Sequence, residues 1–541
     1  MTSANPFHSG ERAAQRRAGV GDVSQWAGGF VRDYLPEQHR AFHTSLPFLV
    51  VAGGDEAGQT WVTLVQGEDG FIRSPDPRRL TMQTALPASD PMAGRFASGG
   101  DIGVVGIELA TRRRNRFSGH ITPTEDGYAI DMHQTFGNCP QYIHERALRR
   151  VAHPGGGRAI RSDRLSEGQS ARIRAADTLF IGSGQYADGA GPANGYDASH
   201  RGGAPGFVHV VGDRHLRIPD YAGNNFFNTI GNIMSDPRVG LLFVDFETGG
   251  LLHISGRATV EWSPRDSHDP DAWRMIDVQI ERVIERPGAT ALRWSRQDQG
   301  LRKLRLARRV AETEGVTSFY LSPADGRPLD PFHAGQHLPV TVQIPGQAGQ
   351  STRSYSLSGA PDQAGQYRLS VKREEHGLVS RYLHDNLRVG QMIEARDPSG
   401  EFVIPEGGGP VVLASAGVGL TPMVAMLHEL ARGQRPAWFV HGARNGRGHA
   451  LRDEVSELVG HHAHLRQRLF YSRPEAGDLT GRGDVVSGRM TARDLVRLQP
   501  EAETRYMLCG PGRFLAELRD GLETLGVQPD HIHFETFGPA G

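Results

Sequence analysis

VVLASAGVGLTPMVAML, residues 411–427, reads as an apolar strand, a glycine-rich loop and a helix. Glycines allow the backbone to approach a pyrophosphate, and the N-terminus of the following helix stabilises its negative charge. Proline suits the first turn of such a helix. This order predicts a dinucleotide-binding loop, whose candidate binding residues are Gly417, Gly419, Thr421 and Pro422.

Strands and helices alternate on both sides of this loop. Apolar strands are expected at 410–416, 437–441 and 465–471, with helices at 422–431 and 451–459. This alternation predicts an α/β domain with a parallel sheet over residues 407–541. Ligands of open α/β sheets bind beyond the carboxyl ends of the strands. Candidate binding residues at that edge are His441, Arg444, Ser472, Arg473 and Cys509.

Residues 304–406 are rich in short strands separated by Gly and Pro turns, which predicts an antiparallel β-barrel. Arg353 and Tyr355 are two residues apart on one strand and therefore share a face. Arg353 can hold a flavin pyrophosphate and Tyr355 can cover the ring, while Ser356 points the other way. Gly377 and Ser380 begin a helix and offer an anion site, although this piece taken alone is better interpreted as a plain helix cap.

Taken together and in this order, six motifs resemble the ferredoxin–NADP reductase superfamily, especially the reductase halves of flavohaemoglobins and oxygenase reductases. The resemblance covers residues 304–541 and implies hydride transfer from NAD(P)H to FAD. It implies catalytic roles for Ser356, Cys509 and Glu535, with the cysteine beside the nicotinamide. The FAD-binding residues that it implies are Arg353, Tyr355, Ser356, Lys372, Gly377, Val379, Ser380 and Phe537.

The nucleotide preference is predicted from the end of the strand 465–471, which runs into Ser472-Arg473-Pro474. A hydroxyl beside a guanidinium suits a ribose 2′-phosphate. Arg444 can add charge from the neighbouring loop. We therefore expect NADPH to be preferred over NADH. The alternative is that Arg473 is one of many surface arginines in an arginine-rich chain.

The N-terminal half contains an internal repeat. Residues 67–72 match residues 203–208, and residues 102–108 match 239–245, with a nearly constant offset of 136 or 137. Each copy, of about 100 residues, begins with a short helix (36–43 and 166–175) followed by short strands between Gly, Asp and Pro turns. This pattern predicts a duplicated all-β barrel whose two copies pair within the chain.

This doubled unit resembles the pyridoxamine-phosphate-oxidase-like split barrels, most of which bind FMN. The resemblance depends on residues 199–208, 223–232 and 136–143. The two copies have diverged in sequence: the arginine run 112–116 of the first copy corresponds to residues 249–253 of the second, which contain no arginine. Two equivalent sites are therefore not expected. We interpret that run as a solvated β-turn and Cys139 as a buried structural residue. Candidate FMN-binding residues are Ser199, His200, Arg201, Asn225, Asn228 and Asn232.

The segment 263–302 is expected to hold the end of the barrel and a linker, with a helix near 275–284. The predicted organisation is therefore a duplicated split-barrel domain over 1–290, an FAD-binding barrel over 304–406 and a nucleotide-binding domain over 407–541. We expect electrons to pass from NAD(P)H through FAD to FMN and then to an unknown small-molecule or protein acceptor. The alternatives are that the barrel is a docking module, or that it binds haem or another ligand.

Composition narrows the classes of partner. The formal net charge is −1, which does not favour nucleic acid or an acidic membrane surface. Two cysteines exclude a disulfide framework and a four-cysteine iron–sulfur cluster, and no metal site is expected. No signal peptide and no run of 18 apolar residues is found, so a cytoplasmic protein is expected.

Overall fold

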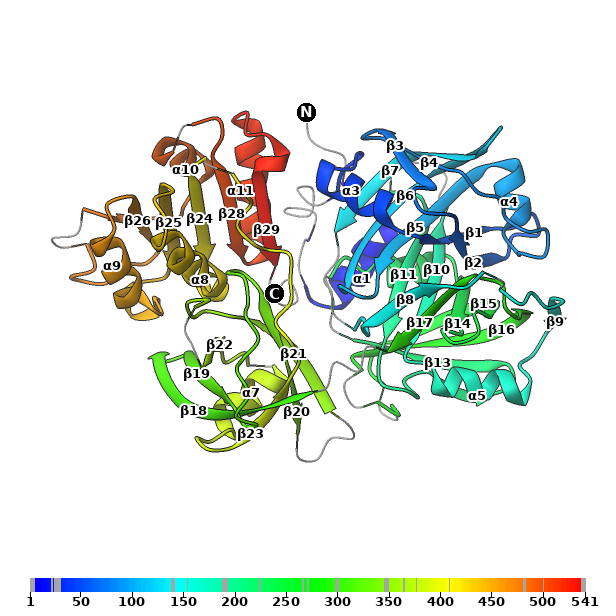
Figure 1. Cartoon of the computed structure of the whole chain (residues 1–541). Helices are drawn as coiled ribbons and strands as arrows, with labels where there is room; N and C mark the ends of the chain where they lie inside the picture. Colours follow the sequence, from blue (N-terminus) through cyan, green and yellow to red (C-terminus); the bar gives the residue numbers. More distant parts are fainter. Residues whose placement is uncertain are drawn as a thin grey trace. The chain divides into compact units, whose positions relative to one another are not determined.

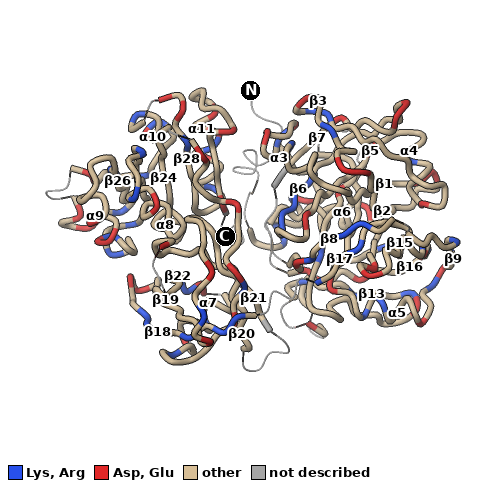
Figure 2. The backbone as a smooth tube through the Cα atoms, viewed as in Figure 1, with Lys and Arg blue, Asp and Glu red and all other residues tan. Residues whose placement is uncertain are grey.

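A computed structural model divides the chain into two units, residues 1–297 and 298–540 (Figure 1). Basic and acidic residues are interspersed along the backbone of both units, in keeping with the near-zero net charge (Figure 2). The residues that the structure describes are 5–20, 23, 31–137, 142–152, 154–186, 193–221, 223, 225–264, 267–269, 272–296, 301–344, 350–362, 365–375, 377–407, 409–479, 483–499 and 501–536.

The first copy in unit 1 is a seven-stranded sheet with two short helices. Its elements are α3 (Glu37–Ser45), β1 (Phe48–Gly54), β2 (Thr60–Gln66), β3 (Ile72–Asp76), β4 (Arg79–Met82), α4 (Ala93–Ser98), β5 (Gly100–Glu108), β6 (Arg113–Thr124), β7 (Gly127–Gly137) and β8 (Arg146–Arg150). A further helix, α1 (Ser9–Arg17), precedes this copy.

The second copy follows the same plan. Its elements are β9 (Ile160–Ser162), α5 (Glu167–Ala175), β10 (Thr178–Gln185), β11 (Gly195–Gly202), β12 (His209–Gly212), β13 (His215–Asp220), α6 (Asn228–Ser235), β14 (Arg238–Val244), β15 (Leu251–Glu261), β16 (Arg274–Arg286) and β17 (Leu292–Arg296).

Both sheets have one strand order. The first runs β2-β1-β5-β6-β7-β4-β3 and the second β11-β10-β14-β15-β16-β13-β12, which is the same order with each strand replaced by its counterpart. The pairing register shifts at Ser118/Gly119 in one copy and at Ser255/Gly256 in the other. A Cβ on either glycine would collide with a carbonyl oxygen of the opposite strand. The same β-bulge, with the same glycine, therefore recurs in both copies.

The two copies meet through equivalent strands and a shared core. β8 pairs antiparallel with its counterpart β17, and Leu148 lies opposite Trp294 at the centre of this ribbon. The ring of Trp294 packs edge-on against Phe48 of the first copy and Phe246 of the second, each at a centroid distance of 5.4 Å. One buried apolar cluster contains side chains from both copies, including Val50. The copies are therefore packed as two halves of one unit.

The segment near 275–284 is a strand, so the prediction of a helix there is wrong. Residues 274–286 form β16, which pairs with β15 over its whole length and also with β13 and β9. Unit 1 continues through β17 to residue 297. This segment is therefore central to the second sheet.

Unit 2 begins with a six-stranded antiparallel sheet in the order β21-β20-β23-β18-β19-β22. Its interior is one apolar cluster, to which Val379 and Leu383 of the helix α7 contribute. The elements are β18 (Arg302–Thr313), β19 (Val316–Pro323), β20 (His337–Gln343), β21 (Gln350–Ser356), β22 (Tyr367–Lys372), α7 (Leu378–Asp385) and β23 (Met392–Ala395).

The rest of unit 2 is a parallel sheet in the order β27-β26-β25-β24-β28-β29. The chain adds strands to one side of β24 and later to the other, so the carboxyl end of β24 is a topological switch point. The elements are β24 (Val411–Ala416), η1 (Gly417–Gly419), α8 (Leu420–Ala431), β25 (Ala437–Ala443), η2 (Gly446–Gly448), α9 (Arg452–His461), β26 (Leu465–Tyr471), β27 (Val485–Ser487), α10 (Ala492–Leu498), β28 (Arg505–Gly510), α11 (Gly512–Thr524), η3 (Pro529–His531) and β29 (Ile532–Thr536).

A buried ion pair joins the two layers of unit 2. Arg368 of β22 donates to both carboxylate oxygens of Glu454 on α9, at 2.6 and 2.8 Å. His428 of α8 lies 2.6 Å from the same carboxylate. These hydrogen bonds and charges hold the pKa of Glu454 down to about 2, against the opposing effect of burial. Breaking a buried pair leaves an uncompensated charge, so this contact fixes the barrel against the parallel sheet.

Among the described helices, none is both long enough and apolar enough to cross a membrane. Within the same residues, no group of three or more His, Cys, Asp or Glu side chains is placed to bind a metal ion.

Candidate functional site

The loop after β24 uses its two glycines for different reasons. Gly417 has φ +58°, a left-handed conformation that glycine adopts without strain, and its missing side chain faces open space. Gly419 instead packs on the end of β28, where a Cβ would lie 2.6 Å from the carbonyl carbon of Cys509. The loop is therefore pressed against the Cys509–Pro511 segment, and Gly419 permits that approach.

Helix α8 begins at this loop with no side-chain cap. The hydroxyl of Thr421 donates to the carbonyl of Val418 at 3.1 Å and so closes the loop on itself. Pro422 lies in the first turn, as expected. The remaining first-turn amides and the helix dipole form an anion site at the switch point of the sheet.

His441 packs beneath the carboxyl-end edge of the parallel sheet. It is fully buried at the end of β25, and its Nδ1 lies 2.9 Å from the hydroxyl of Ser415. Burial lowers the pKa of His441 to about 4, so the ring is neutral. Its ring packs against His449 at 4.6 Å, and His449 reaches the hydroxyl of Tyr471 at 3.1 Å. Direct contact between His441 and a nucleotide was expected, but the structure places this ring beneath the surface.

The loops after β25 and β26 are joined through their backbones. The amide of Ser472 donates to Ala443, and the amide of Arg473 donates to Arg444 at 2.8 Å. The side chains of Ser472, Arg473 and Arg444 are all exposed. The structure therefore brings together the three residues expected to bind a 2′-phosphate.

The predicted flavin face of β21 has the expected alternation. Arg353 and Tyr355 are half-buried on one side, and Tyr355 packs on the same apolar cluster as Val379 of α7. Among the described residues, the guanidinium of Arg353 donates only to the carbonyl of its neighbour Thr352, at 2.8 Å. On the other side, the hydroxyl of Ser356 is enclosed and has no hydrogen-bond partner among the described residues. A buried hydroxyl without a partner fits a missing ligand at this strand.

Helix α7 begins at Gly377, again without a side-chain cap. The hydroxyl of Ser380 donates to the carbonyl of Gly377 at 3.2 Å and would collide with any Cβ on that residue. This contact explains the Gly-x-x-Ser pattern. Val379 is buried, so only its backbone can reach an anion. Lys372 is exposed and paired at 2.8 Å with Glu374, whose backbone contacts this helix start.

Cys509 and Glu535 lie opposite each other on β28 and β29. Cys509 is fully buried, and burial together with Glu535 holds the pKa of its thiol well above the usual value. The Oε2 atom of Glu535 is enclosed and has no hydrogen-bond partner within the described part of the chain, and burial raises the pKa of this carboxyl to about 8. Cys509 is therefore a neutral core thiol, whereas Glu535 can hold a proton near neutral pH. Phe537 lies outside the described residues.

Unit 1 contains a polar cavity of about 120 Å³ that both copies line. Its volume suits a phosphoryl group with a few waters. Ser199, His200, Arg201, Asn225 and Asn228 line it, as predicted for one site. Additional lining residues are the cations Arg114, Arg116 and Arg274 and the aromatic residues Tyr142, Tyr221 and Phe227. We call this cavity the arginine pocket.

Carboxylates hold the guanidinium groups in place. Arg201 and Arg274 both donate to Asp220 at 2.7 Å, and Arg116 donates to Asp197 at 3.0 Å and to Ser199. Arg114, the fourth cation, lies 3.2 Å from the His200 ring. Burial lowers the pKa of that ring far below its usual value, so His200 is neutral. Four guanidiniums line this pocket and two carboxylates hold them, an arrangement that favours an anionic ligand such as a phosphate dianion.

The interpretation of residues 112–116 as a solvated turn is wrong for Arg114 and Arg116. The turn spans residues 109–112, and β6 starts at Arg113. Arg114 and Arg116 lie two residues apart on this strand, which places both on the pocket face.

The backbone around the arginine pocket is strained. Among the described residues, five that are not glycine have positive φ, and three of these line the pocket: Tyr142 (64°), Asn225 (60°) and Phe227 (61°). Such conformations cost about 1–3 kcal/mol each and cluster at functional sites. Tyr142 stacks on Tyr221 at 5.1 Å, so the strained backbone also presents a flat aromatic surface.

The equivalent place in the other half is apolar. Equivalent register positions match Arg116 with His253 and His200 with Leu64. Leu64 is buried in the shared core, and His253 is buried with its Nδ1 2.8 Å from the Val62 carbonyl. The described residues therefore form this pocket in one half only.

Two candidate residues lie elsewhere. Asn232 is further along α6, where its amide is bonded to His8 at 2.8 Å and to Ser183 at 3.0 Å. Cys139 lies outside the described residues.

Two family models match unit 2, an oxidoreductase FAD-binding domain over residues 311–404 and an oxidoreductase NAD-binding domain over residues 413–520. A flavohemoprotein of Deinococcus radiodurans is 42% identical over 241 residues, which are 44% of this chain and 60% of that protein. A flavohemoprotein of Bordetella pertussis is 39% identical over 288 residues, which are 50% of this chain and 70% of that protein. The chain belongs to the flavohemoprotein family.

The likeness to flavohemoproteins concerns the reductase part, because both family models lie in unit 2. The chain spans about 60% of the length of the first relatives that it matches. A solved structure, the flavohem-like FAD/NAD binding domain of nitric oxide dioxygenase from Vibrio cholerae, is 35% identical. That similarity covers 44% of this chain and 99% of the solved chain, with a TM-score of 0.41.

The flavohemoprotein matches confirm several predictions. The C-terminal half has an FAD-binding domain followed by a nucleotide-binding domain, as the resemblance to the ferredoxin–NADP reductase superfamily implied. By class the chain is an NAD(P)H-dependent flavin oxidoreductase. The roles of single residues, the split-barrel resemblance and FMN stay predictions.

Sequence reasoning missed several residues in both units. The pair Arg368–Glu454 could not be found, because its members are 86 residues apart in different layers. Arg274 and Asp197, which contribute to the arginine pocket, lie in no sequence motif that would indicate a binding site. Arg116 had a usable signal, since it alternates with Arg114 at the period of a strand.

Proposed function

We propose that this chain is an NAD(P)H-dependent flavoprotein reductase that passes hydride to FAD in unit 2 and electrons onward to FMN in unit 1. FAD supplies the conversion of a hydride into transferable electrons, and the protein supplies binding and orientation. The observation that carries the reductase part is that two enclosed polar atoms, Ser356 Oγ and Glu535 Oε2, have no partner among the residues that the structure describes. The same unit has two helix starts without a side-chain cap.

In this proposal each residue of unit 2 has one task. Arg353 and the start of α7 bind the FAD pyrophosphate, and Tyr355 covers the ring. Ser356 donates its free hydroxyl toward the ring nitrogen that receives hydride. Glu535 holds a proton at its enclosed carboxyl, because its raised pKa keeps it neutral at pH 7. The first turn of α8 binds the dinucleotide pyrophosphate.

NADPH is the proposed donor, and Arg473→Ala tests this preference. Arg473 is exposed beside Ser472, with no side-chain partner among the described residues, and its loop is bonded to that of Arg444. Loss of a bidentate phosphate contact should weaken NADPH selectively, by about tenfold in kcat/KM, since 1.4 kcal/mol is tenfold. NADH should be unaffected.

The control for Arg473 is Arg466→Ala, an exposed arginine earlier on β26. Steady-state kinetics with both nucleotides give the ratio. A wild type that prefers NADH, or an unchanged ratio in Arg473→Ala, would show that this pair does not bind a 2′-phosphate.

For unit 1 the proposed ligand is FMN, with its phosphate among the arginines. The four guanidiniums, the stacked tyrosines and the strained backbone of the arginine pocket all support a phosphate-bearing aromatic ligand. The pocket as enclosed suits the phosphate, and the ring would extend beyond it. The acceptor that takes electrons from FMN, and whether the unit also docks a partner protein, remain to be found with an acceptor panel.

Flavin analysis distinguishes FMN from the alternatives. We expect purified protein to release both FAD and FMN on denaturation, and Arg116→Ala to release FAD alone. This arginine is as deeply buried as Arg274 in the same pocket, and a hydrogen bond to a charged group contributes about 1.5–3 kcal/mol. FAD alone in wild type would favour a docking module, and a Soret band would favour haem.

A further inference from the structure

The N-terminal helix α1 belongs to neither copy of the repeat, yet it packs on the helix that borders the arginine pocket. A Cβ on Gly231 of α6 would lie 2.5 Å from the Cα of Glu11, and a Cβ on Gly10 would collide with the carbonyl of Gly231. The two helices therefore cross at their glycines, with backbones in contact. At the ends of this crossing, Phe7 packs on Phe226 at 5.4 Å, and Gln15 donates to the Phe226 carbonyl.

This crossing brings one acidic side chain under the pocket. Glu11 is buried, and it accepts from the His8 amide at 2.9 Å and from the side chain of Asn228. The amide oxygen of Asn228 in turn accepts from Arg116 at 2.9 Å. Asn228 and Arg116 both line the arginine pocket. A continuous chain of hydrogen bonds thus leads from α1 to the pocket.

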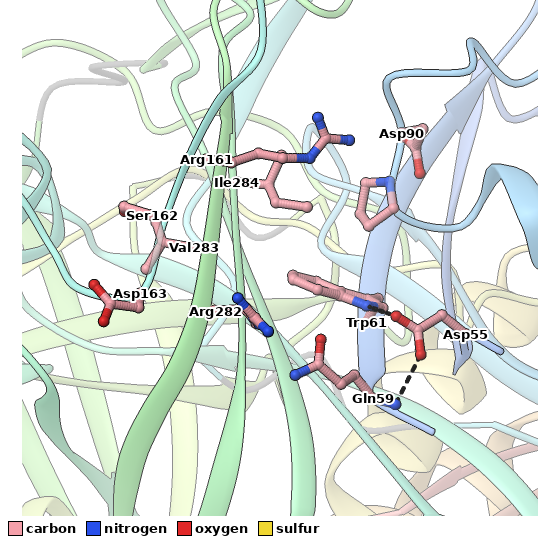
Figure 3. A pocket seen from close by; sticks show the side chains of 11 residues that line it. Asp55, Gln59, Trp61, Asp90, Arg161, Ser162, Asp163, Arg282, Val283 and Ile284 are labelled. Atoms are coloured by element: carbon pink, nitrogen blue, oxygen red, sulfur yellow. Dashed lines mark hydrogen bonds between the residues drawn. The ribbon is translucent and has the colours of Figure 1, made fainter. Parts of the chain in front are cut away.

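The other half shows what unit 1 looks like without such a helix. Register positions match Gln134, which donates to the Pro6 carbonyl before α1, with Arg282. Arg282 lines an open cavity of about 500 Å³, together with Trp61, the counterpart of Asp197. In Figure 3 the labelled side chains of both copies surround this hollow.

The repeat offset of 137 matches Gly231 with Gly94 of α4. A Cβ on Gly94 would meet only one atom, Glu56 Oε1 at 4.0 Å, so the space that α1 occupies in one half is open in the other. The fold of the first copy therefore does not require a helix over Gly94. The half that has the helix is the half that has the arginine pocket.

We propose that α1 completes the arginine pocket and that Glu11 is a positioning residue, which orients Arg116 through Asn228 for a phosphate-bearing ligand and holds a proton while that ligand is bound. This inference rests on the proposed function of unit 1, because FMN is its test ligand. It adds a residue outside both repeats and a pH dependence.

The charges around Glu11 set the direction of that dependence. His8 faces it from the N-cap of its own helix, Arg116 from β6 and Asp197 from β11, while Arg12 acts on His8. Burial, the largest effect, raises the pKa of Glu11 to about 8, and burial lowers the pKa of His8 to about 4. Glu11 is therefore neutral at pH 7. Above pH 8 its carboxylate cancels one positive charge of the pocket and repels a phosphate, so ligand affinity should fall.

The test is equilibrium dialysis of the full-length protein against FMN between pH 6.5 and 9, with FMN and FAD separated by chromatography. A phosphate monoester is a dianion over most of this range, so its own titration contributes little. Wild type should bind FMN about fivefold more weakly at pH 9 than at pH 7. Glu11→Ala should bind about tenfold more weakly at pH 7, because Arg116 loses its alignment.

Glu11→Gln keeps a neutral side chain of the same shape, so it should bind nearly as tightly as wild type at pH 7 and show no loss at pH 9. Glu56→Gln is the matched control, because Glu56 lies at the equivalent place in the half without the helix. It should retain the affinity and the pH profile of wild type. Circular dichroism verifies that each variant is folded.

Either of two results would overturn the inference about Glu11 but not the proposed function of unit 1. One is a folded Glu11→Ala with unchanged FMN affinity, and the other is a Glu11→Gln that keeps the pH dependence of wild type. Inorganic phosphate is the second probe, and its binding is measured by isothermal titration calorimetry. If wild type binds phosphate but not FMN, the flavin assignment fails and the Glu11 variants are compared with phosphate. If wild type binds neither, both proposals are wrong.

Discussion

Gly419→Ala is expected to lower NAD(P)H-dependent reduction of an artificial acceptor such as ferricyanide by about 10²-fold, the typical cost of a 1 Å misplacement in an active site. The added Cβ would lie 2.6 Å from the Cys509 carbonyl carbon, and the neighbouring atoms are backbone that cannot rotate away. The loop must therefore move off the end of β28, and the start of α8 moves with it.

Gly460→Ala is the matched control, the same change in helix α9. A Cβ on Gly460 would meet no atom within 4 Å. This variant should retain the reductase activity and the melting temperature of wild type. Equal losses of activity in the two variants would contradict the explanation of the Gly419 effect by its contact with Cys509.

Arg353→Ala should cause the second large loss, that of bound FAD. Within the described residues its guanidinium has only a neighbouring carbonyl as a partner, so a charge-assisted bond to a pyrophosphate is available. Such a bond contributes about 1.5–3 kcal/mol, which corresponds to roughly 10–150-fold in Kd. FAD per chain after gel filtration measures the effect.

The control for this loss is Arg305→Ala, the same change at an exposed position on β18. It should retain FAD. Full FAD content in Arg353→Ala would remove Arg353 from the flavin site.

Short-range pattern was sufficient to predict unit 2. The strand, loop and helix around Gly417 and Gly419 are local, and the structure has them as expected. What could not be predicted is why Gly419 is needed, because its neighbour Cys509 is 90 residues away in the chain.

The wrong helix at 275–284 has a specific cause. Ile276, Val278 and Ile280 are buried at the alternation of a strand, but the bulge opposite Gly256 leaves Glu281 as an extra residue. Burial resumes at Val283, so the apolar residues acquire helical spacing. A bulge resets the period of two, and the sequence alone does not show where.

The arginine pocket was predicted in part, because Ser199, His200 and Arg201 form a local cluster. Its remaining parts converge from distant segments. Glu11 and Asn228 are 217 residues apart, and Tyr142 follows the first sheet while Tyr221 follows β13. Only the three-dimensional pairing of the copies brings them together.

The fusion of both barrel copies into one polypeptide has a genetic consequence. In a homodimer every mutation appears twice, once in each subunit, so both symmetry-related places change together. Here residues such as Leu64 and His200 occupy equivalent positions but are encoded separately. One half could therefore acquire a binding pocket while the equivalent place in the other half became part of the apolar core. Each chain also combines one arginine pocket with one FAD-binding domain, so the two are present in a fixed ratio of one to one.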